Sequence, residues 1–418
     1  MHTTSFFSTF ADFTHYLDGL GLFSMRLGLE RINAALDALD LRIAHAPVVH
    51  VVGTNGKGST AGFTEALARA HGIRTGLYTS PHLVQVRERI RVNGQMLGPD
   101  LWLTAANRVM ACCADMGLTY FELLTVLAMW LFREHEVELC ILEAGLGGTH
   151  DAICAIAAQV VAMTPVGLDH EQILGPGLMD IAQDKSGALG RCPAVLGCQP
   201  DAVARLFAHV CARTGQKYTE LAECATPHGF ALPYGTGVLH CSRAMLPAHP
   251  PYQVANAALA SLAWQEIAAQ HAWGVSHERS CQALGRTVFP GRFCQHGTIL
   301  VDGAHNSMGL SALCQALEQD GRHFDLLIFQ SMADKQLDPA VLTRVQALCD
   351  RVCVPALPGN ARASEASALA RYFSCPVQEA DSLNQALALA QNGSVLVCGS
   401  LYLVGAFYAA RPEFFPLT

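Results

Sequence analysis

Charged residues are scarce in this sequence of 418 residues, and they carry no basic excess. They make up 15% of the chain, with 27 lysine and arginine residues against 35 aspartate and glutamate residues, a formal net charge of −8. A general nucleic-acid binder needs a positive surface, so this balance argues against that class. Hydrophobic residues reach 51%, which excludes disorder and is enough for a large core. At about 100–200 residues per domain, we expect two domains.

The sequence also lacks a long hydrophobic run. The densest one, Val126 to Phe132, is far shorter than the roughly 20 residues of a membrane-spanning helix. The segment from Met1 to Phe7 has no basic stretch of the kind that opens a secretory signal. We therefore expect a cytoplasmic protein without a membrane partner.

No pair of the C-x-x-C kind occurs, although the chain has 16 cysteines. Most of them lie inside apolar stretches, such as Leu139–Leu142 and Val395–Gly399. Cysteines in such surroundings act as small hydrophobic side chains in a reducing compartment. The pattern predicts neither a disulfide framework nor a cysteine metal site.

Lysine is rare as well, with only Lys57, Lys185, Lys217 and Lys335 in the chain. Arginine therefore supplies nearly all the positive charge. Because the two residues differ in chemistry, a lysine inside a Gly/Ser loop is a candidate functional residue, and three of the four lie in such loops.

Short apolar runs alternate with helical patterns through the first two thirds of the chain. Val48–Val52 is typical of a strand buried on both faces, and a glycine-rich turn and a helix from Thr60 to Gly72 follow it. An amphipathic helix is predicted over 26–45, with an apolar stripe of Leu27, Ile32, Leu36 and Leu39. Further strands are predicted at 73–79, 138–143, 160–163 and 194–197, and helices at 120–135, 200–217 and 251–270. Alternation of this kind predicts βαβ units around a parallel sheet.

A second alternating series starts after an interruption at 287–291. It predicts strands at 299–302, 326–329, 351–355 and 395–398, with helices that begin near 309, 339 and 364. Residues 218–250, rich in Pro and Gly, predict short antiparallel strands. The sequence therefore predicts an α/β protein with two domains, 1–288 and 289–418.

The turn Gly53–Ser59, with the sequence Gly-Thr-Asn-Gly-Lys-Gly-Ser, lies between a predicted strand and a predicted helix. Its glycines allow backbone N–H groups to converge on phosphate, and the helix N-terminus favours negative charge. Lys57 can reach the terminal phosphates, and Ser59 or Thr60 can offer a hydroxyl to Mg²⁺. The hydroxyl comes two residues after the lysine, so the spacing differs from the usual phosphate-loop motif, and an ordinary glycine turn stays a possible reading.

Two further groups lie at the same predicted sheet edge. Glu143 closes a strand before a glycine-rich loop and is placed to hold Mg²⁺ near a nucleotide, although a structural carboxylate is an equal reading. Asp169-His170 follows the strand at 160–163. Lys185 is a phosphate contact, a lysine modified by CO₂ to a carbamate, or a plain helix-end lysine; the carbamate requires a depressed pKa. One nucleotide held between the two domains would explain polar residues as far apart as Asn256, Arg292 and Asp302.

Together these segments resemble the folylpolyglutamate synthase/dihydrofolate synthase family of the Mur-ligase superfamily, from about residue 16 to 405. The motifs that carry the resemblance are Leu27–Arg31, Gly53–Ser59, Thr79–Leu83, Glu88–Val92, Leu118–Glu122, Leu142–Gly148, Gly167–His170, the Lys185 segment, Phe289–Phe293, Asp302–Asn306, Met332–Lys335 and Gly399–Tyr402. Leu27–Arg31 and Leu118–Glu122 are closer to the bifunctional bacterial branch than to a polyglutamylase-only branch.

The resemblance implies a Mur-ligase-like P-loop ATPase domain with a mostly parallel sheet, and a smaller Rossmann-like C-terminal domain that binds glutamate and closes on ATP. It implies ATP and two Mg²⁺ ions, with a carbamylated Lys185, and catalytic roles for Lys57, Lys185 and His170. ATP would contact Thr54, Asn55, Gly56, Lys57, Gly58, Ser59, Asn256, Arg292 and Asp302. Mg²⁺ would be held by Ser80, Glu143 and His170. The pterin would be bordered by Arg26, Leu27, Gly28, Leu29, Thr119, Tyr120, Phe121, Glu122, His150, Asp151 and Ala152, and glutamate by His305 and Ser400.

The sequence departs from the family pattern beside the expected pterin site. The family has Gly-Gly-Arg-Leu-Asp-Ala-Thr-Asn where this chain reads Gly147-Gly-Thr-His-Asp-Ala-Ile-Cys154. Thr149 thus replaces an arginine and Cys154 an asparagine, while Asp151 is kept. Asp184 and Ser186 replace the usual Glu and Ala on either side of Lys185.

The expected activity is an ATP-dependent ligase that adds L-glutamate to dihydropteroate and to reduced folates through an acyl phosphate, in a monomer whose partners are small molecules. Three alternatives stay open at this point. One is a folylpolyglutamate synthase that cannot use dihydropteroate. Another is a Mur-type ligase for a different acid, disfavoured because the ATPase motifs begin close to residue 1. The last is a non-catalytic nucleotide-binding regulator, suggested only by the departures at 149–154.

Overall fold

The structure, a computed structural model, describes residues 6–21, 26, 28–221, 225–226, 229–234, 237–246 and 249–415. In this part of the chain the first sheet has eight strands in the order β4-β3-β2-β5-β1-β6-β7-β8. The strands are β1 (Val48–Val52), β2 (Thr75–Tyr78), β3 (Ile90–Val92), β4 (Gln95–Met96), β5 (Leu139–Glu143), β6 (Val160–Met163), β7 (Ala194–Leu196) and β8 (Tyr218–Glu220). The six strands from β2 to β8 in this order run parallel, whereas β3 pairs antiparallel with both β2 and β4.

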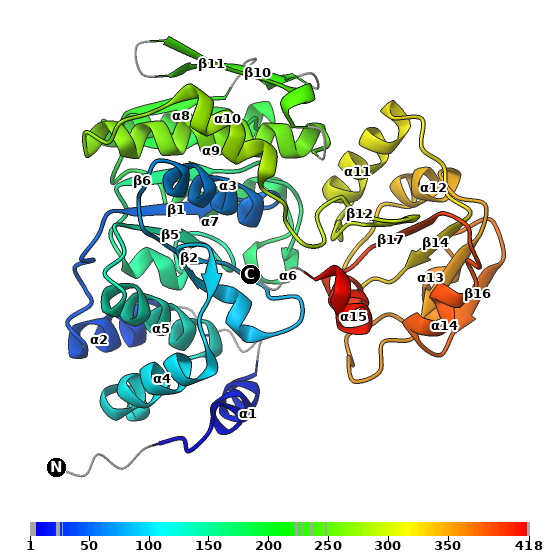
Figure 1. Ribbon diagram of the computed structural model, residues 1–418, viewed down its shortest axis with the longest axis horizontal. Helices are drawn as coiled ribbons and strands as arrows, with labels where there is room; N and C mark the ends of the chain where they lie inside the picture. Colours follow the sequence, from blue (N-terminus) through cyan, green and yellow to red (C-terminus); the bar gives the residue numbers. More distant parts are fainter. Residues whose placement is uncertain are drawn as a thin grey trace.

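Helices cover both faces of this sheet (Figure 1). They are α1 (Phe10–Leu20), α2 (Glu30–Ala38), α3 (Lys57–Ala70), α4 (Pro99–Cys113), α5 (Tyr120–Glu134), α6 (Glu171–Leu174), α7 (Leu178–Ser186), α8 (Asp201–Thr214), α9 (Pro251–Gln270) and α10 (His277–Arg286). Val49 and Val51 of β1 pack with α3 and α9 on one face, and Val48 and Val52 belong to the core under α5 on the other. The continuous β-branched run of β1 is therefore buried on both faces, as predicted.

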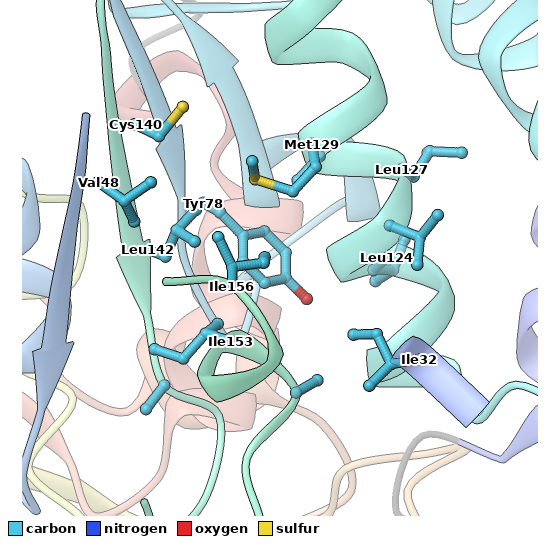
Figure 2. Packing of buried hydrophobic residues seen from close by; sticks show 14 of the residues in the cluster. Ile32, Val48, Tyr78, Leu124, Leu127, Met129, Cys140, Leu142, Ile153 and Ile156 are labelled. Carbon is cyan, nitrogen blue, oxygen red and sulfur yellow. The ribbon is translucent and has the colours of Figure 1, made fainter. Parts of the chain in front are cut away.

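The core under α5 holds the first sheet against its larger helical layer (Figure 2). Figure 2 shows Tyr78 between the strands and α5, with Leu124 and Met129 of α5 on the side to which Val48 and Leu142 point. The hydroxyl of the buried Tyr78 lies 3.3 Å from Thr125 Oγ1. A dry core of this size fixes the strands whose ends carry the polar residues described below.

The second sheet lies to one side of the first (Figure 1) and, within the described residues, has six strands in the order β12-β13-β17-β14-β15-β16. The strands are β12 (Cys294–His296), β13 (Ile299–Val301), β14 (Leu326–Phe329), β15 (Val352–Pro355), β16 (Val377–Ala380) and β17 (Val395–Cys398). Its helices are α11 (Ser307–Gln319), α12 (Pro339–Ala347), α13 (Ala366–Ala370), α14 (Leu383–Ala388) and α15 (Leu401–Ala410). All strand pairs are parallel except β12 with β13.

A small antiparallel sheet and five short 3₁₀ helices complete the described elements. The sheet contains β9 (Ala225–Thr226), β10 (Gly229–Tyr234) and β11 (Gly237–Ser242), which confirms antiparallel pairing within 218–250. The first residues of that segment, Tyr218–Glu220, instead form β8, which pairs in parallel with β7. The 3₁₀ helices are η1 (Val86–Arg89), η2 (Ala114–Met116), η3 (Ala152–Ala155), η4 (Arg243–Met245) and η5 (Pro412–Phe414). No helix in the described residues has the length and apolar character that crossing a membrane requires.

Most predicted elements are present, but several boundaries are wrong. The helix predicted over 26–45 is only α2, because Gly28 adopts φ 110° and the helix begins at Glu30. Ile32 and Leu36 of its stripe are fully buried, whereas Leu27 lies outside the described residues. α3 begins at Lys57 and not at Thr60.

Two strands of the second sheet were absent from the prediction. β12 is a three-residue antiparallel strand, and β16 exposes Gln378 and Glu379, so neither forms an apolar run. Every cysteine in the described part of the chain is a free thiol, in agreement with the prediction of no disulfide framework.

Candidate active site

The neighbouring parallel strands β2, β5, β1 and β6 all end at one edge of the first sheet. A polar segment follows or closes each of them: Ser80, Glu143, Gly53–Ser59 and Asp169–His170. We call these four segments the near wall. Ligands of open α/β sheets bind at this carboxyl edge, so the strand order alone gathers the predicted near-wall residues.

The opposite side of the site comes from the second sheet and its junction. Arg292, Asp302–Asn306 and Lys335 form what we call the far wall. A cavity of about 470 Å³, a volume typical of small-molecule sites, is lined by both walls. All predicted site residues line it except Gly28 and Leu29, and Leu27 lies outside the described residues. Leu29 packs instead against the core of the first sheet.

Glycines of the loop Gly53–Ser59 are required by close contacts. Gly56 has φ 88°, and a Cβ added there would lie 2.3 Å from Asn256 Oδ1. A Cβ on Gly58 would lie 3.3 Å from Glu143 Oε2. Since α3 begins at Lys57, the loop presents helix N-terminal N–H groups to the cavity, which suits a phosphate group.

Lys57 is held inside this loop. Its Nζ donates a hydrogen bond to the carbonyl of Thr54 at 2.9 Å. The loop itself is fixed to the next strand, because the N–H of Thr54 donates to Pro165 O and its hydroxyl to Gly167 O. Burial lowers the pKa of Lys57, and the nearby Glu143 and Asp169 carboxylates oppose that shift. The ammonium group is therefore positioned before any ligand binds.

Glu143 is the buried carboxylate of the near wall. Its Oε2 accepts a hydrogen bond from the backbone N–H of Ser80 at 2.9 Å. Burial raises the pKa of Glu143, and Lys57 acts against that shift. A cation close to this carboxylate would replace part of its lost hydration.

The donor set fits a magnesium ion bound through a nucleotide. In the described residues, no three His, Cys, Asp or Glu side chains gather to hold a metal ion. Mg²⁺ in nucleotide sites commonly takes one or two protein ligands and completes its shell with phosphate oxygens and water. The Glu143 carboxylate and the Ser80 hydroxyl, both at the cavity, match that pattern.

His170 lies at the mouth of the near wall in a left-handed backbone conformation, with φ 56°. Its Nε2 is 3.8 Å from Asp169 Oδ1, and burial lowers the pKa of His170 to about 4. Burial of Asp169 disfavours its charge, but the nearby His305 side chain and the Lys335 ammonium group outweigh that and hold its pKa well below the usual range. His170 is thus neutral and Asp169 charged at neutral pH.

Lys185, on α7, is almost fully buried behind the loop Gly53–Ser59. Its Nζ donates to the carbonyl of Gly53 at 2.8 Å. Burial, with a smaller contribution from Lys57, lowers the pKa of Lys185 to about 7. About half of its amine is therefore unprotonated at neutral pH, which meets the condition for reaction with CO₂.

Asp302 ties the far wall to α9. Its Oδ2 accepts hydrogen bonds from Tyr252 Oη and from the N–H of Phe293, both at 2.8 Å, and its Oδ1 accepts from the N–H of Ala304 at 2.7 Å. Burial raises the pKa of Asp302, against the charge of Arg292. On the same helix α9, Asn256 donates to Gln253, which donates to Ser59 Oγ at 3.0 Å. The ATP residues predicted from distant segments therefore converge.

Three of the predicted pterin residues, Thr119, Glu122 and Asp151, line the cavity and also make structural contacts. Thr119 and Glu122 form a capping box at the start of α5, and Glu122 also binds Arg31 at 3.0 Å. Asp151 accepts hydrogen bonds from the N–H groups of Leu146 and Ile153, and burial raises its pKa to about 6.

Two of the departures from the family pattern, Thr149 and Cys154, make contacts outside the cavity, whereas a third, His150 in place of a leucine, lines it. Thr149 Oγ1 donates to Asp184 O at 2.8 Å, and Cys154 Sγ contacts Gly148 O at 2.8 Å. Neither residue lines the cavity, whereas His150, Asp151 and Ala152 do.

The two residues predicted for glutamate lie on different segments of the second sheet's domain. His305 Nδ1 is 2.8 Å from Gly303 O, and its Nε2 is 3.7 Å from Asp169 Oδ2. Ser400 caps α15, where its hydroxyl accepts a hydrogen bond from the N–H of Tyr402. Both line the cavity, but each is already engaged by its own loop.

Two known relatives are similar along nearly the whole chain. The dihydrofolate synthase/folylpolyglutamate synthase of Escherichia coli is 31% identical over 414 residues, which cover 95% of this chain and 94% of the relative. The folylpolyglutamate synthase of Lacticaseibacillus casei is 32% identical, over 90% of this chain and 92% of the relative. This chain belongs to the dihydrofolate synthase/folylpolyglutamate synthase family. No family model matches it.

Solved structures of the dihydrofolate synthase/folylpolyglutamate synthase family have the same fold. E. coli FolC in complex with DHPP and ADP has a TM-score of 0.85 at 29% identity and covers 97% of this chain and 98% of its own. The bifunctional enzyme of Yersinia pestis complexed with AMPPNP and Mn ion has a TM-score of 0.85 at 30% identity and covers 99% of both chains. The predicted family and fold are confirmed.

Several cavity residues were not among the predicted site residues of this family member. Asp169, Asn306 and Lys335 take part in contacts between the walls, and Tyr252 of α9 donates to Asp302 of the far wall. Asp169, Asn306 and Lys335 lie inside the motifs that carry the resemblance, and Lys335 is one of only four lysines. Because lysine is scarce in this sequence, its rarity could have marked Lys335 as a candidate functional residue.

Proposed function

We propose that this chain is an ATP-dependent ligase that adds L-glutamate to dihydropteroate and to reduced folates. The observation that carries the proposal is one cavity lined by a phosphate-binding loop on the near wall and by Arg292 and Asp302 on the far wall. Identity of about 30% to dihydrofolate synthase/folylpolyglutamate synthases over nearly the whole chain supports the same activity.

The reaction joins a carboxylate to an amine at the expense of ATP. The folate carboxylate attacks the γ-phosphate, and ADP leaves. The α-amine of glutamate then attacks the carbonyl carbon of the acyl phosphate; the new C–N bond gives the amide, inorganic phosphate leaves, and the amine gives up a proton. Lys57 and the N–H groups of Gly53–Ser59 orient the phosphates and offset their charge, since positioning and charge stabilisation dominate phosphoryl transfer. Closure of the far wall excludes the water that would hydrolyse the acyl phosphate.

Two Mg²⁺ ions are part of the proposal, held by Ser80, Glu143 and His170. When bound, they would neutralise charge on the phosphate oxygens. Support comes from the AMPPNP and Mn ion complex of the Y. pestis relative and from the carboxylate and hydroxyl donors at the cavity.

We further propose that Lys185 is carbamylated. The neutral amine adds CO₂ and loses one proton, which converts a buried cation into an anion. The pKa of about 7 supports this step, as does the position of Nζ beside Gly53 O at the base of the nucleotide loop.

The substrate positions follow the sequence analysis. The pterin is placed against Arg26, Tyr120, Phe121, His150, Asp151 and Ala152, with Thr119 and Glu122 forming the start of α5, and glutamate against His305 and Ser400. Because Thr149 and Cys154 do not line the cavity and Asp151 is kept, we retain dihydropteroate among the substrates. A folylpolyglutamate synthase without dihydropteroate activity is the second candidate, favoured by the departures at 149–154, of which His150 lines the cavity.

The organisation proposed for this activity is two domains, 1–288 and 289–418, in a cytoplasmic monomer. The interruption between α10, which ends at Arg286, and β12, which begins at Cys294, supports the division. Both walls come from the same chain, so one copy suffices to line the cavity.

The test is release of ADP with ATP and magnesium, using dihydropteroate and tetrahydrofolate separately, each with and without L-glutamate. We expect turnover that needs both the pterin acid and glutamate, with the amide product identified by mass spectrometry. Glutamate-dependent turnover with tetrahydrofolate but not with dihydropteroate would select the second candidate. ADP release that needs neither compound would contradict both.

A further inference from the structure

Asp169 lies where the two walls touch. Its Oδ1 forms an ion pair with Lys335 Nζ. Its Oδ2 accepts a hydrogen bond of 2.9 Å from Asn306 Nδ2 and lies 3.7 Å from His305 Nε2. The carboxylate also accepts the N–H of His170 at 2.8 Å. All three side-chain partners come from the far wall, although Asp169 belongs to the near wall.

Asn306 connects the same point to the nucleotide loop. It exchanges two hydrogen bonds with Asn55, of 2.9 and 3.0 Å, across 251 residues of sequence. Its Oδ1 also accepts the N–H of Gly309 at 2.8 Å and so caps α11. The amide of Asn306 is buried, and its donors and acceptor are all engaged.

Burial makes these contacts strong. Side-chain exposure is 7% for Asp169 and 12% for Lys335, so their attraction is little screened by water. An ion pair outside the cavity, between Arg243 of η4 and Asp320 at the end of α11, is 30% exposed on both sides. Exposed pairs contribute little, whereas removing one partner of a buried pair leaves an uncompensated charge.

We propose that Lys335 and Asn306 are positioning residues that hold the far wall closed over the nucleotide loop, with Asp169 as their common acceptor. The inference rests on the proposed function, because closure matters only if an acyl phosphate must be shielded. The position of Asn55 then depends on the far wall. When Asn306 is hydrogen-bonded to Asn55, the loop Gly53–Ser59 and the far wall are joined directly. Because Lys335 is paired with Asp169, its role is to hold the far wall in position and not to bind the incoming amino acid.

The test uses the full chain and compares Lys335→Met, Lys335→Arg and Asn306→Asp with the matched control Arg243→Met. Asn306→Asp keeps an oxygen to cap α11 but replaces both donors and faces the Asp169 carboxylate. Product and phosphate are measured separately, with and without L-glutamate, and the radius of gyration is measured by small-angle scattering with ADP and magnesium. Thermal unfolding identifies variants that fail to fold.

We expect Lys335→Met and Asn306→Asp to lower product formation by about 100-fold, the scale for a broken buried pair. Phosphate released per product should rise about tenfold, because water then reaches the acyl phosphate, and the radius of gyration should increase. Lys335→Arg should restore most of the product formed per phosphate released, and Arg243→Met should change product formation by no more than about twofold.

A raised KM for glutamate with unchanged phosphate-to-product ratio would overturn the proposal and make Lys335 a ligand of the amino acid. An unchanged radius of gyration in both Lys335→Met and Asn306→Asp would also overturn it. Failure of the proposed function has a different signature, since the wild-type chain itself would show no pterin-dependent turnover while the scattering comparison would still report on the contact.

Discussion

The two walls of the cavity satisfy their polar groups in different ways. On the near wall and the adjacent Lys185, the charged groups nearest the phosphate loop contact neighbouring backbone: Lys57 donates to Thr54, Lys185 donates to Gly53, and Glu143 accepts from Ser80. Asn55 and Asp169 of the near wall contact the far wall instead. On the far wall, Lys335 and Asn306 pair with side chains of the near wall, and Asp302 adds Tyr252 of α9 to its two backbone donors. The near wall is therefore preorganised by its own sheet, whereas the alignment of the far wall depends on the near wall.

The largest expected effect comes from Lys57→Ala, which removes the positioned cation of the near wall. Turnover should fall by about 10³-fold, the scale for loss of a preorganised charge. The free energy of unfolding should not fall, because burying an ammonium group is costly. ADP release and thermal unfolding measure the two quantities, with the exposed Lys217→Ala as control. Turnover of Lys57→Ala at the wild-type rate would show that the near-wall lysine takes no part in the reaction.

Glu143→Gln should have the next largest effect, since it keeps an oxygen for the Ser80 N–H but loses the charge. We expect turnover to fall about 100-fold. The magnesium concentration for half-maximal rate should rise at the same time. Titration of magnesium at saturating ATP tests this, and an unchanged magnesium requirement would contradict a metal role for Glu143.

Acid should destabilise the strand beneath the near wall. Burial, assisted by Arg191, lowers the pKa of His50 on β1 to about 3, and no hydrogen-bond partner is present for its Nε2. The unfolded chain binds this proton below about pH 6.5 and the folded chain does not, so stability is lost as the pH falls from 6.5 towards 3. Between pH 7 and pH 5 this histidine should cost about 2 kcal/mol of unfolding free energy.

Denaturant titrations of His50→Val at the two pH values measure that contribution. The variant should lose about 2 kcal/mol less than wild type on acidification. His209→Gln, at an exposed position of α8, is the control and should leave the pH dependence unchanged. Equal losses in wild type and His50→Val would place the acid sensitivity elsewhere.

The smallest effect should come from Tyr252→Phe, which removes one contact between α9 and the far wall. Asp302 keeps two backbone donors, from Phe293 and Ala304, so its position is mostly retained. We expect about a fivefold rise in the KM for ATP, near 1 kcal/mol, with kcat changed less. Steady-state kinetics with Tyr218→Phe, an exposed site, as control would show whether the far wall is set by this hydroxyl. A loss as large as that of Lys57→Ala would mean that the walls do not differ as described.

The sequence predicted the near wall better than the far wall, for a physical reason. Parallel strands end at a common edge, so Gly53–Ser59 and Glu143 could be placed together once their strands were located. The pairing of Asp169 with Lys335 spans 166 residues and leaves no periodic pattern. Its geometry depends on how two sheets meet, which local propensity does not determine.

The errors in the fold have the same origin. The apolar stripe of α2 was visible, but its start depends on Gly28 adopting φ 110°, which the helical period does not reveal. β16 went unseen because an edge strand with exposed Gln378 and Glu379 carries no hydrophobic run. Buried strands and long helices such as α9 were predictable because burial dictates their composition.

The placement of the four lysines has a practical side. Lys185 is buried and Lys335 nearly so, and Lys57 lies within the phosphate loop, while Lys217 has a side chain that is 71% exposed. Amine-reactive reagents should therefore attach a dye or a surface to one lysine, remote from the cavity, and leave the crevice free.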